Sequence, residues 1–451
     1  MEHYGLLTLL PTAIVLCMTL LSHRTIESVM AGSLTAFIIV DGWDFLSQFS
    51  YTLQEAFKND TNVWVLLVCA MYGSFIALLV RAGGTQAFGD LVAKRVSSKK
   101  GSLICTWLLG LAIFLDDYLN SLTVSSSMKK VTDKFKVSRE MLAYVVDSTA
   151  APVCLLVPLS TWAVYYAGLL EKNGLAESGQ GMALFIASMP YMFYPIIAVL
   201  MVPLVIMGVI PLLGKMKAAE HRAETTGQLT PSHGEHSEVC DTYVEQELHN
   251  PNGELFFIPI ITLIFFTLWF DIDLLMGVIA ATMATVLQYW LAGVLKLTEI
   301  FDTMMDGLKT MLPVLVILVA VFMLIEANNH IGFTAYIIEY VTPLMNAKTL
   351  PVVTFISMAL VSFVTGSNWG VFAIAFPVVI PLAIAMDVSI PLVVGALLSA
   401  SGFGSQACFY SDSTVLSAQG SGCGTFEHAI SQLPYVLIAA ALAAIGFYVI
   451  A

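Results

Sequence analysis

Phe114-Leu-Asp-Asp-Tyr-Leu-Asn120 decides the fold, together with Asp147-Ser-Thr-Ala-Ala-Pro152, because both place polar and helix-breaking residues between apolar segments. The second half of the chain carries a comparable pair, Thr365-Gly-Ser-Asn-Trp-Gly370 followed by Ser399-Ala-Ser-Gly-Phe-Gly-Ser405. In a membrane, backbone that is not helical is tolerated only where protein or water surrounds it. Two such pairs therefore predict interrupted helices that line an internal site.

The two pairs are separated by a constant distance along the chain. Asp117 and Asn368 are 251 positions apart, and so are Ser138 and Ser389, which open the helical runs that follow. A constant offset between interrupted membrane segments is typical of a transporter built from inverted repeats. Few residues are identical along the offset, so the expected repeat depends on the order of elements and breaks.

The composition indicates a membrane protein. Of 451 residues, 58% are hydrophobic and 11% are charged, and the mean hydropathy is +0.84. A soluble domain carries about 25% charged residues, and the apolar runs here approach the length that crosses a bilayer core of roughly 30 Å. We expect a polytopic protein of the bacterial inner membrane, embedded in the lipid bilayer, with Leu6 to Ser22 as a retained span. The net charge of −13 argues against a nucleic-acid partner.

Lysine and arginine positions predict the orientation. The clusters from Lys94 to Lys100 and from Lys129 to Arg139 are both expected in the cytoplasm. The fifteen residues from Gly101 to Leu115 reach only about 22 Å as a helix, so they predict a re-entrant hairpin rather than a full span. The first half then has an odd number of spans, which inverts the second half and places both termini outside. On this map sixteen of the nineteen basic residues are cytoplasmic.

The predicted fold is an all-α polytopic membrane protein with two inverted-topology repeats, each containing a re-entrant hairpin and a broken transmembrane helix. The first repeat covers residues 1–214, with scaffold spans in 1–80, the hairpin and broken helix in 101–170 and a span in 191–213. Residues 215–253 form a hydrophilic cytoplasmic linker, expected to be solvated and partly disordered. The second repeat covers residues 254–451, with scaffold spans in 255–328, the hairpin and broken helix in 350–419 and a span in 433–450.

Helices that stop inside a membrane expose carbonyl oxygens at one end and N–H groups at the other, each end carrying about half a unit charge. Carbonyls combined with side-chain oxygens form a dehydrated cage for a hard cation such as Na+. We expect a first cation site at Asn120, Ser148 and Thr149 and a second cation or substrate site at Thr365, Ser367, Asn368, Ser399, Ser401, Ser405, Gln406 and Asp412. Within them, the expected Na+ ligands are Asn120, Ser148, Asn368 and Ser401. The alternative is that these residues only satisfy packing between helices.

Carboxylates inside a bilayer are costly and therefore indicate function. A carboxylate that can exchange a proton for a cation is the minimum that proton-coupled antiport requires. Asp117 and Asp147 are the favoured ion- and proton-coupling residues, whereas Asp116 could orient the hairpin tip through hydrogen bonds. Asp412 fits either a ligand or a helix N-cap, and Glu326 could face water.

At these motifs the sequence resembles a known family. The residues from Phe114 to Asn120, Asp147-Ser-Thr-Ala-Ala-Pro-Val153 and Pro158-Leu-Ser-Thr-Trp162 look like the signature region of the NhaC-type sodium/proton antiporters, which belong to the ion transporter superfamily. Tyr410-Ser-Asp-Ser-Thr-Val-Leu-Ser417 and Gln432-Leu-Pro-Tyr435 are similar to the family's C-terminal stretches. The resemblance implies a sodium-linked secondary transporter, commonly a homodimer, in which hairpins and broken helices move as an elevator against a scaffold.

The chain departs from the family at Ser405-Gln406, where many members have Asp followed by His or Lys. Two transport hypotheses follow: Na+/H+ antiport, and Na+-coupled movement or exchange of a small organic solute such as an amino acid or hydroxy acid. An intramembrane aspartyl enzyme using Asp147 and Asp412 is disfavoured, because the Gly-x-Gly-Asp loop of such proteases is absent. A channel is also disfavoured, since occluded cages suit alternating access better than a continuous pore. No organic cofactor is expected.

Overall fold

The computed structural model describes residues 3–22, 24–172, 175–177, 180–231, 252–366 and 370–451, and every regular element in these ranges is helical. The helices are α1 (Leu10–Ser22), α2 (Thr25–Asp41), α3 (Phe45–Ala56), α4 (Asp60–Arg81), α5 (Gly84–Ala93), α6 (Lys99–Ala112), α7 (Asp117–Lys134), α8 (Arg139–Asp147), α9 (Ala151–Leu155), α10 (Thr161–Lys172), α11 (Gly181–Ser188), α12 (Phe193–Met207), α13 (Gly214–Thr226), α14 (Glu254–Trp269), α15 (Leu274–Leu291), α16 (Leu297–Ile331), α17 (Phe333–Val341), α18 (Leu350–Thr365), α19 (Gly370–Ala385), α20 (Ile390–Ala407), α21 (Asp412–Ser421) and α22 (Thr425–Ile450). Short 3₁₀ helices precede α1 and α3 and follow α11 and α17.

The prediction of an all-helical polytopic membrane protein is confirmed. Within the described residues, six helices are long and apolar enough to cross a membrane. A seventh span results if α11 with its 3₁₀ extension and α12, which meet at 53°, are counted together. Many large apolar side chains on these helices remain exposed, as expected for surfaces that face lipid.

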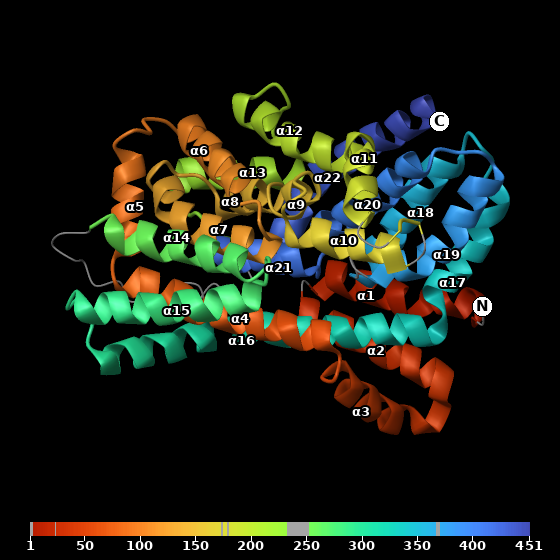
Figure 1. The fold of residues 1–451 in the computed structure, drawn as a ribbon, viewed down its shortest axis with the longest axis horizontal. Coiled ribbons are helices and arrows are strands. Elements are labelled where there is room, and N and C mark those ends of the chain that lie inside the picture. The colour runs from red at the N-terminus through yellow and green to blue at the C-terminus, as the bar shows by residue number, and fades with distance from the viewer. Residues whose placement is uncertain (1–2, 23, 173–174, 178–179, 232–251, 367–369) are drawn as a thin grey trace.

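Helix α16 packs against both α4 and α2, and these three helices lie in the lower part of Figure 1. Gly73 on α4 and Gly307 on α16 bring the two backbones together: a Cβ at Gly73 would lie 2.6 Å from the Gly307 carbonyl oxygen. Such close approach at small residues is a common basis of helix association in membranes. Helix α16 runs without interruption for 35 residues, from Leu297 to Ile331.

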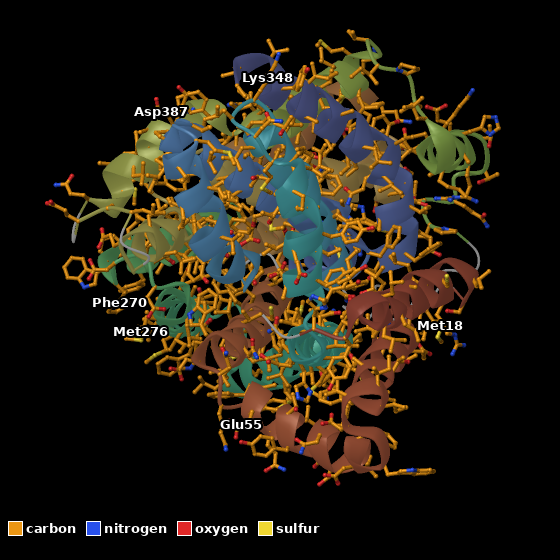
Figure 2. All side chains as sticks on the ribbon, turned by 90° about the vertical axis from the view of Figure 1, so that its right-hand side faces the viewer. Met18, Glu55, Phe270, Met276, Lys348 and Asp387 are labelled. Carbon is orange, nitrogen blue, oxygen red and sulfur yellow. The ribbon has the colours of Figure 1, made fainter. Side chains whose placement is uncertain are left out.

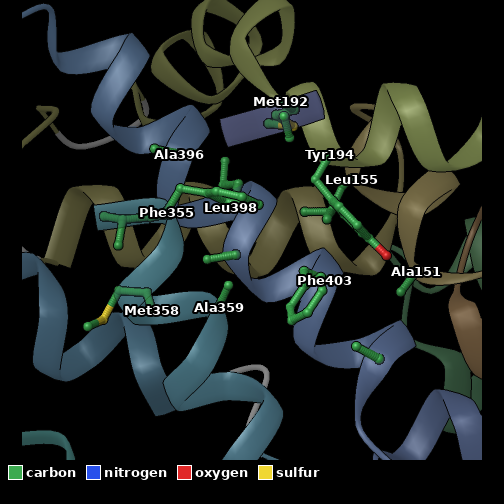
Figure 3. Packing of buried hydrophobic residues seen from close by; sticks show 14 of the residues in the cluster. Ala151, Leu155, Met192, Tyr194, Phe355, Met358, Ala359, Ala396, Leu398 and Phe403 are labelled. Atoms are coloured by element: carbon green, nitrogen blue, oxygen red, sulfur yellow. The ribbon is translucent and has the colours of Figure 1, made fainter. Parts of the chain in front are cut away.

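Helices α6 to α9 of the first half lie close to α20, α21 and α22 of the second half, above α4 and α16 in Figure 1. From the side, Figure 2 shows Lys348 and Asp387 at the end of the molecule opposite to Glu55 on α3. Figure 3 shows how α20 fits into this group, with Phe403 beside Tyr194 and Leu155 and with Leu398 near Phe355. This packing buries α20 from Leu392 to Ala407.

The first hairpin consists of α6 and α7, joined by residues 113–116, and the first break separates α8 from α9 at residues 148–150. Asp116 ends the hairpin tip and caps α7 by accepting hydrogen bonds from its first N–H groups. The second hairpin consists of α18 and α19. Gly366 at its tip has a φ of +68°, a left-handed conformation that favours glycine.

The second break lies later than we predicted. Ser399, Ser401 and Ser405 are all inside the continuous helix α20, and the chain leaves the helical path only at residues 408–411. Ser and Gly are tolerated in a membrane helix when neighbouring helices pack closely against them. Gly404 shows this, because a Cβ there would overlap the Ser362 hydroxyl of α18.

The linker also differs from the prediction at its N-terminal end. Residues 214–226 form helix α13, whose Met216, Ala219 and Ala223 are buried, instead of a solvated connector. Arg222 donates to both carboxylate oxygens of Glu140 on α8 at 2.9 Å, and Lys99 on α6 pairs with Glu220 and Glu224 of α13. Residues 232–251 of the linker lie outside the described residues.

Candidate functional site

The first hairpin tip places two adjacent carboxylates in the interior. One oxygen of Asp116 accepts the N–H groups of Tyr118 at 2.8 Å and Leu119 at 3.2 Å, and its other oxygen accepts the Thr161 hydroxyl at 2.7 Å. Asp116 is 2% exposed, so these three donors replace its water. Asp116 therefore accepts hydrogen bonds from the N–H groups that begin α7, the kind of contact that the sequence analysis considered for it.

Asp117 is fully buried and only partly satisfied. Its Oδ1 accepts the indole N–H of Trp162 at 2.9 Å, whereas its Oδ2 has no hydrogen-bond partner among the described residues. Within the described residues, no lysine or arginine forms an ion pair with Asp117. An unpaired carboxylate oxygen in a water-free interior is strongly unfavourable unless a proton or a cation neutralises it.

Asn120 sits one helical turn further along α7. Its Nδ2 lies 2.7 Å from the carbonyl oxygens of Gly110 and Ile113 and 2.9 Å from that of Thr149. An amide nitrogen has two hydrogens and cannot satisfy three acceptors, and the Asn120 Oδ1 has no partner in the described structure. The first hairpin and the first break therefore converge on one cluster of oxygen atoms.

Asp412 joins this region from the second half of the chain. Its Oδ2 accepts the Tyr118 hydroxyl at 2.6 Å, and its Oδ1 accepts the Ser413 N–H at 2.9 Å. The charges of Asp116, Asp117 and Asp412 act on one another across this short range. Three carboxylates of like charge near one point favour the binding of positive charge.

Asp147 forms a second polar centre. Its Oδ1 accepts the Ser413 hydroxyl at 2.6 Å, and its Oδ2 faces His428 Nε2 at 3.0 Å and Gln432 Nε2 at 2.8 Å, with the Thr414 hydroxyl at 3.4 Å. Asp147 and His428 are both fully buried. All these partners come from α21 and α22, so Asp147 links the first break to the C-terminal helices.

Gln406 connects the two broken spans. It donates from Nε2 to the Ser148 hydroxyl at 2.6 Å, while its Oε1 accepts the Tyr194 hydroxyl at 2.6 Å. Its backbone carbonyl accepts Gln432 Nε2 at 2.6 Å. The end of α20 and the first break are thus held together by neutral groups.

The remaining predicted residues divide into three groups. Ser401 shares a hydrogen bond of 2.8 Å with the Tyr166 hydroxyl, and the Ser399 hydroxyl lies 3.4 Å from the Tyr194 N–H. The Thr149 and Thr365 hydroxyls bond to carbonyls in the preceding helical turn, and the Ser405 hydroxyl has no hydrogen-bond partner among the described residues. Ser367 and Asn368 lie outside the described residues, and Glu326 is partly buried in α16.

Sequence reasoning missed four partners of the carboxylates: Tyr118, Trp162, His428 and Gln432. His428 and Gln432 are four residues apart in α22 and therefore share one helix face. Polar residues at that spacing in an apolar span are a usable signal, and Gln432 was noticed only as part of a family stretch. Trp162 and Tyr118 belong to quoted motifs, but their contacts with Asp117 and Asp412 join distant segments.

The chain is similar to three proteins of known sequence. It is 25% identical to an uncharacterized protein of Haemophilus influenzae over 98% of this chain and 90% of that protein. It is 28% identical to the malate-2H(+)/Na(+)-lactate antiporter of Bacillus subtilis over 33% of each chain. It is 26% identical to an uncharacterized Na(+)/H(+) antiporter of H. influenzae over 34% of this chain and 32% of that protein.

A match to a described family covers the whole second half of the chain and the last part of the first half. The Na+/H+ antiporter family profile matches residues 153–451, a range that includes Asp412, His428 and Gln432. This is a family of membrane transporters and not an enzyme class. The chain therefore belongs to the Na+/H+ antiporter family.

Proposed function

We propose that this protein exchanges Na+ for protons across the bacterial inner membrane, and that Asp117 is the residue at which the two ions compete. The observation that carries the proposal is the fully buried Asp117 Oδ2, which has no partner within the described structure. A proton or a cation can neutralise it, but not both at once. Mutually exclusive occupancy of one carboxylate is the chemical basis of antiport.

The Na+ would be held between Asp117 and the oxygen cluster around Asn120. Rotation of the Asn120 amide would present Oδ1 to the carbonyls of Gly110, Ile113 and Thr149, and only a cation between these oxygens would make that arrangement favourable. Asp116 keeps the tip rigid through its three hydrogen bonds, and Asp412 adds negative charge from the second half. The Ser148 and Ser401 hydroxyls, both expected as ligands, contribute in this proposal by positioning the breaks.

We further propose that the chain consists of two inverted repeats and works as an elevator. Movement of the hairpins and breaks together is the simplest way to expose such a site to either side of the membrane. The contacts that support this are those among α6 to α9 and α20 to α22, which form a group distinct from the pairing of α2, α4 and α16. A homodimer would anchor the second group in the membrane. These features rest on the family resemblance and on the packing.

The second candidate is exchange of a small organic solute together with Na+. Gln406 favours it, because a neutral amide between two breaks suits a polar solute, and one relative carries malate and lactate in its name. The charge distribution favours simple cations, since Asp116, Asp117, Asp147 and Asp412 surround the breaks and His428 is the basic side chain paired there. An organic anion would meet mainly negative charge.

Everted membrane vesicles test the proposal. Addition of Na+ to energised vesicles containing the protein should collapse the interior acid gradient with no organic solute present. The Asp117→Asn variant should give no response, while Asp306→Asn, which removes an exposed carboxylate paired with Lys309, should respond like the wild type. A gradient that collapses only when a hydroxy acid or amino acid accompanies Na+ would overturn the proposal in favour of the second candidate.

A further inference from the structure

A cavity of about 430 Å³ lies beside the first hairpin, and neither Asp117 nor Asn120 is among its lining residues. Its lining comes from the start of α4, the hairpin tip, α10 and the loop between α14 and α15, and consists of Asp60, Trp64, Val65, Tyr118, Thr161, Val164, Tyr165, Ile272 and Asp273. We call it the Trp64 cavity. In Figure 2 the loop that contributes Ile272 and Asp273 is flanked by Phe270 and Met276. The volume is in the range of pockets that hold small organic ligands, roughly 300 to 1,000 Å³.

Aromatic rings form much of the wall. Trp64 and Tyr118 have ring centroids 6.3 Å apart at 43°, and Tyr165 lines the side provided by α10. Val65, Val164 and Ile272 are the aliphatic residues of the lining. Aromatic faces attract organic cations through the ring quadrupole, and a tryptophan face does so most strongly.

Four carboxylates surround the cavity. Asp60 and Asp273 are exposed lining residues, and Asp273 uses its Oδ1 to cap α15 by accepting the Met276 N–H at 3.1 Å. Beneath the cavity, the lining hydroxyls of Tyr118 and Thr161 donate to the buried Asp412 and Asp116. No lysine or arginine is among the lining residues.

We propose that the Trp64 cavity binds an organic ammonium ion, that is, an amine carried on a small apolar body. The rings and aliphatic side chains would contact the apolar body, and the carboxylates would attract the charged nitrogen. A bare Na+ prefers a shell of oxygen atoms and gains little from such walls, so this site is distinct from the proposed ion site. The inference does not depend on Na+/H+ exchange, because binding can be measured without transport.

Purified full-length protein in detergent permits a direct test with benzylammonium as the probe and benzyl alcohol as its neutral isostere. Benzylammonium should bind saturably by isothermal titration and should raise the thermal unfolding temperature, while benzyl alcohol should do neither at equal concentration. We expect Trp64→Leu to weaken benzylammonium binding about three- to tenfold, and Trp64→Phe to weaken it less. The combined Asp60→Asn and Asp273→Asn variant should weaken it about five- to tenfold. Asn at position 273 retains the helix cap, so the fold is preserved.

Matched controls separate the cavity from the general surface. Trp269→Phe changes an exposed tryptophan outside the cavity, and Asp302→Asn changes an exposed carboxylate on α16. Both should bind benzylammonium like the wild type. Equal binding of benzylammonium and benzyl alcohol, or unchanged affinity in the Asp60 and Asp273 variant, would overturn the proposal. Neither result would bear on the Na+ response of vesicles, which tests the proposed function separately.

Discussion

The two hairpin-and-break units share a backbone plan and differ in charge. Each hairpin packs against its broken span at a glycine: Gly110 lies against Thr149 in the first unit, and Gly404 lies against Ser362 in the second. The first tip carries Asp116, Asp117 and Asn120, whereas the described part of the second tip ends in Thr365 and Gly366. The comparison indicates that close helix packing occurs in both units, while among the described residues the carboxylates of the tips belong to the first.

Residues that follow the second break also contact side chains of the first unit. Asp412 reaches the Tyr118 hydroxyl, and Ser413 reaches Asp147. The four side chains around Asp147 likewise come from helices that follow the second break. The second half therefore supplies partners to carboxylates of the first half, and the site is complete only when both are folded together.

The largest expected effect separates the two tips. Asp117→Asn removes a fully buried tip carboxylate whose Oδ2 has no partner among the described residues, so Na+-dependent proton movement in everted vesicles should fall to the level of empty vesicles. Thr365→Val removes a hydroxyl that bonds its own helix at 2.8 Å and should leave most of the activity. Comparable losses in both variants, at equal protein levels, would show that the two tips share the ion chemistry.

A second prediction concerns the junction between the halves at Asp147. His428→Ala leaves a buried carboxylate with fewer donors, and we expect a loss of stability of about 3 kcal/mol. His428→Gln can still place an N–H near Asp147 and should lose less. Thermal unfolding in detergent, followed by tryptophan fluorescence, measures both. Equal destabilisation by Ala and Gln would show that the imidazole ring packing matters more than its hydrogen bond.

Sequence patterns predicted the helical membrane architecture and most of the carboxylates that meet in the interior. Asp116, Asp117, Asn120 and Asp412 stood out because polar residues between apolar runs are costly. The break in α20 was misplaced, because Ser and Gly break a helix only when packing does not protect them, and Gly404 is protected by α18. The i, i+4 spacing of His428 and Gln432 marks a polar face on α22, but their pairing with Asp147 joins helices far apart in the sequence, so the partner could not be identified from local patterns.

The glycine contacts give a third prediction that tests the shared backbone plan. A methyl group at Gly110 would overlap Thr149, and one at Gly404 would overlap Ser362. Gly110→Ala and Gly404→Ala should each destabilise the protein by about 1 to 3 kcal/mol. Gly168→Ala is the control, because no atom lies within 4 Å of the added Cβ. If only one of the two variants is destabilised relative to Gly168→Ala in thermal unfolding, the units differ in packing as well as in charge.

The smallest expected effect lies in α13, which ties α6 and α8 of the first half to α22 of the second. The hydrogen bond and charge of Lys99, 2.7 Å away, hold the pKa of the Glu224 carboxyl below its usual value of 4.5. The stabilisation is therefore present above pH 4.5 and is lost as the pH falls through the lower pKa of the folded state. Because Glu224 is largely exposed, Glu224→Gln should cost under about 1 kcal/mol at neutral pH. In thermal unfolding, wild type and Glu224→Gln should differ at pH 7 and converge in acid, since protonation removes the same charge as the substitution. A difference that persists unchanged in acid would mean that Glu224 stabilises α13 through packing instead of through its pairing with Lys99.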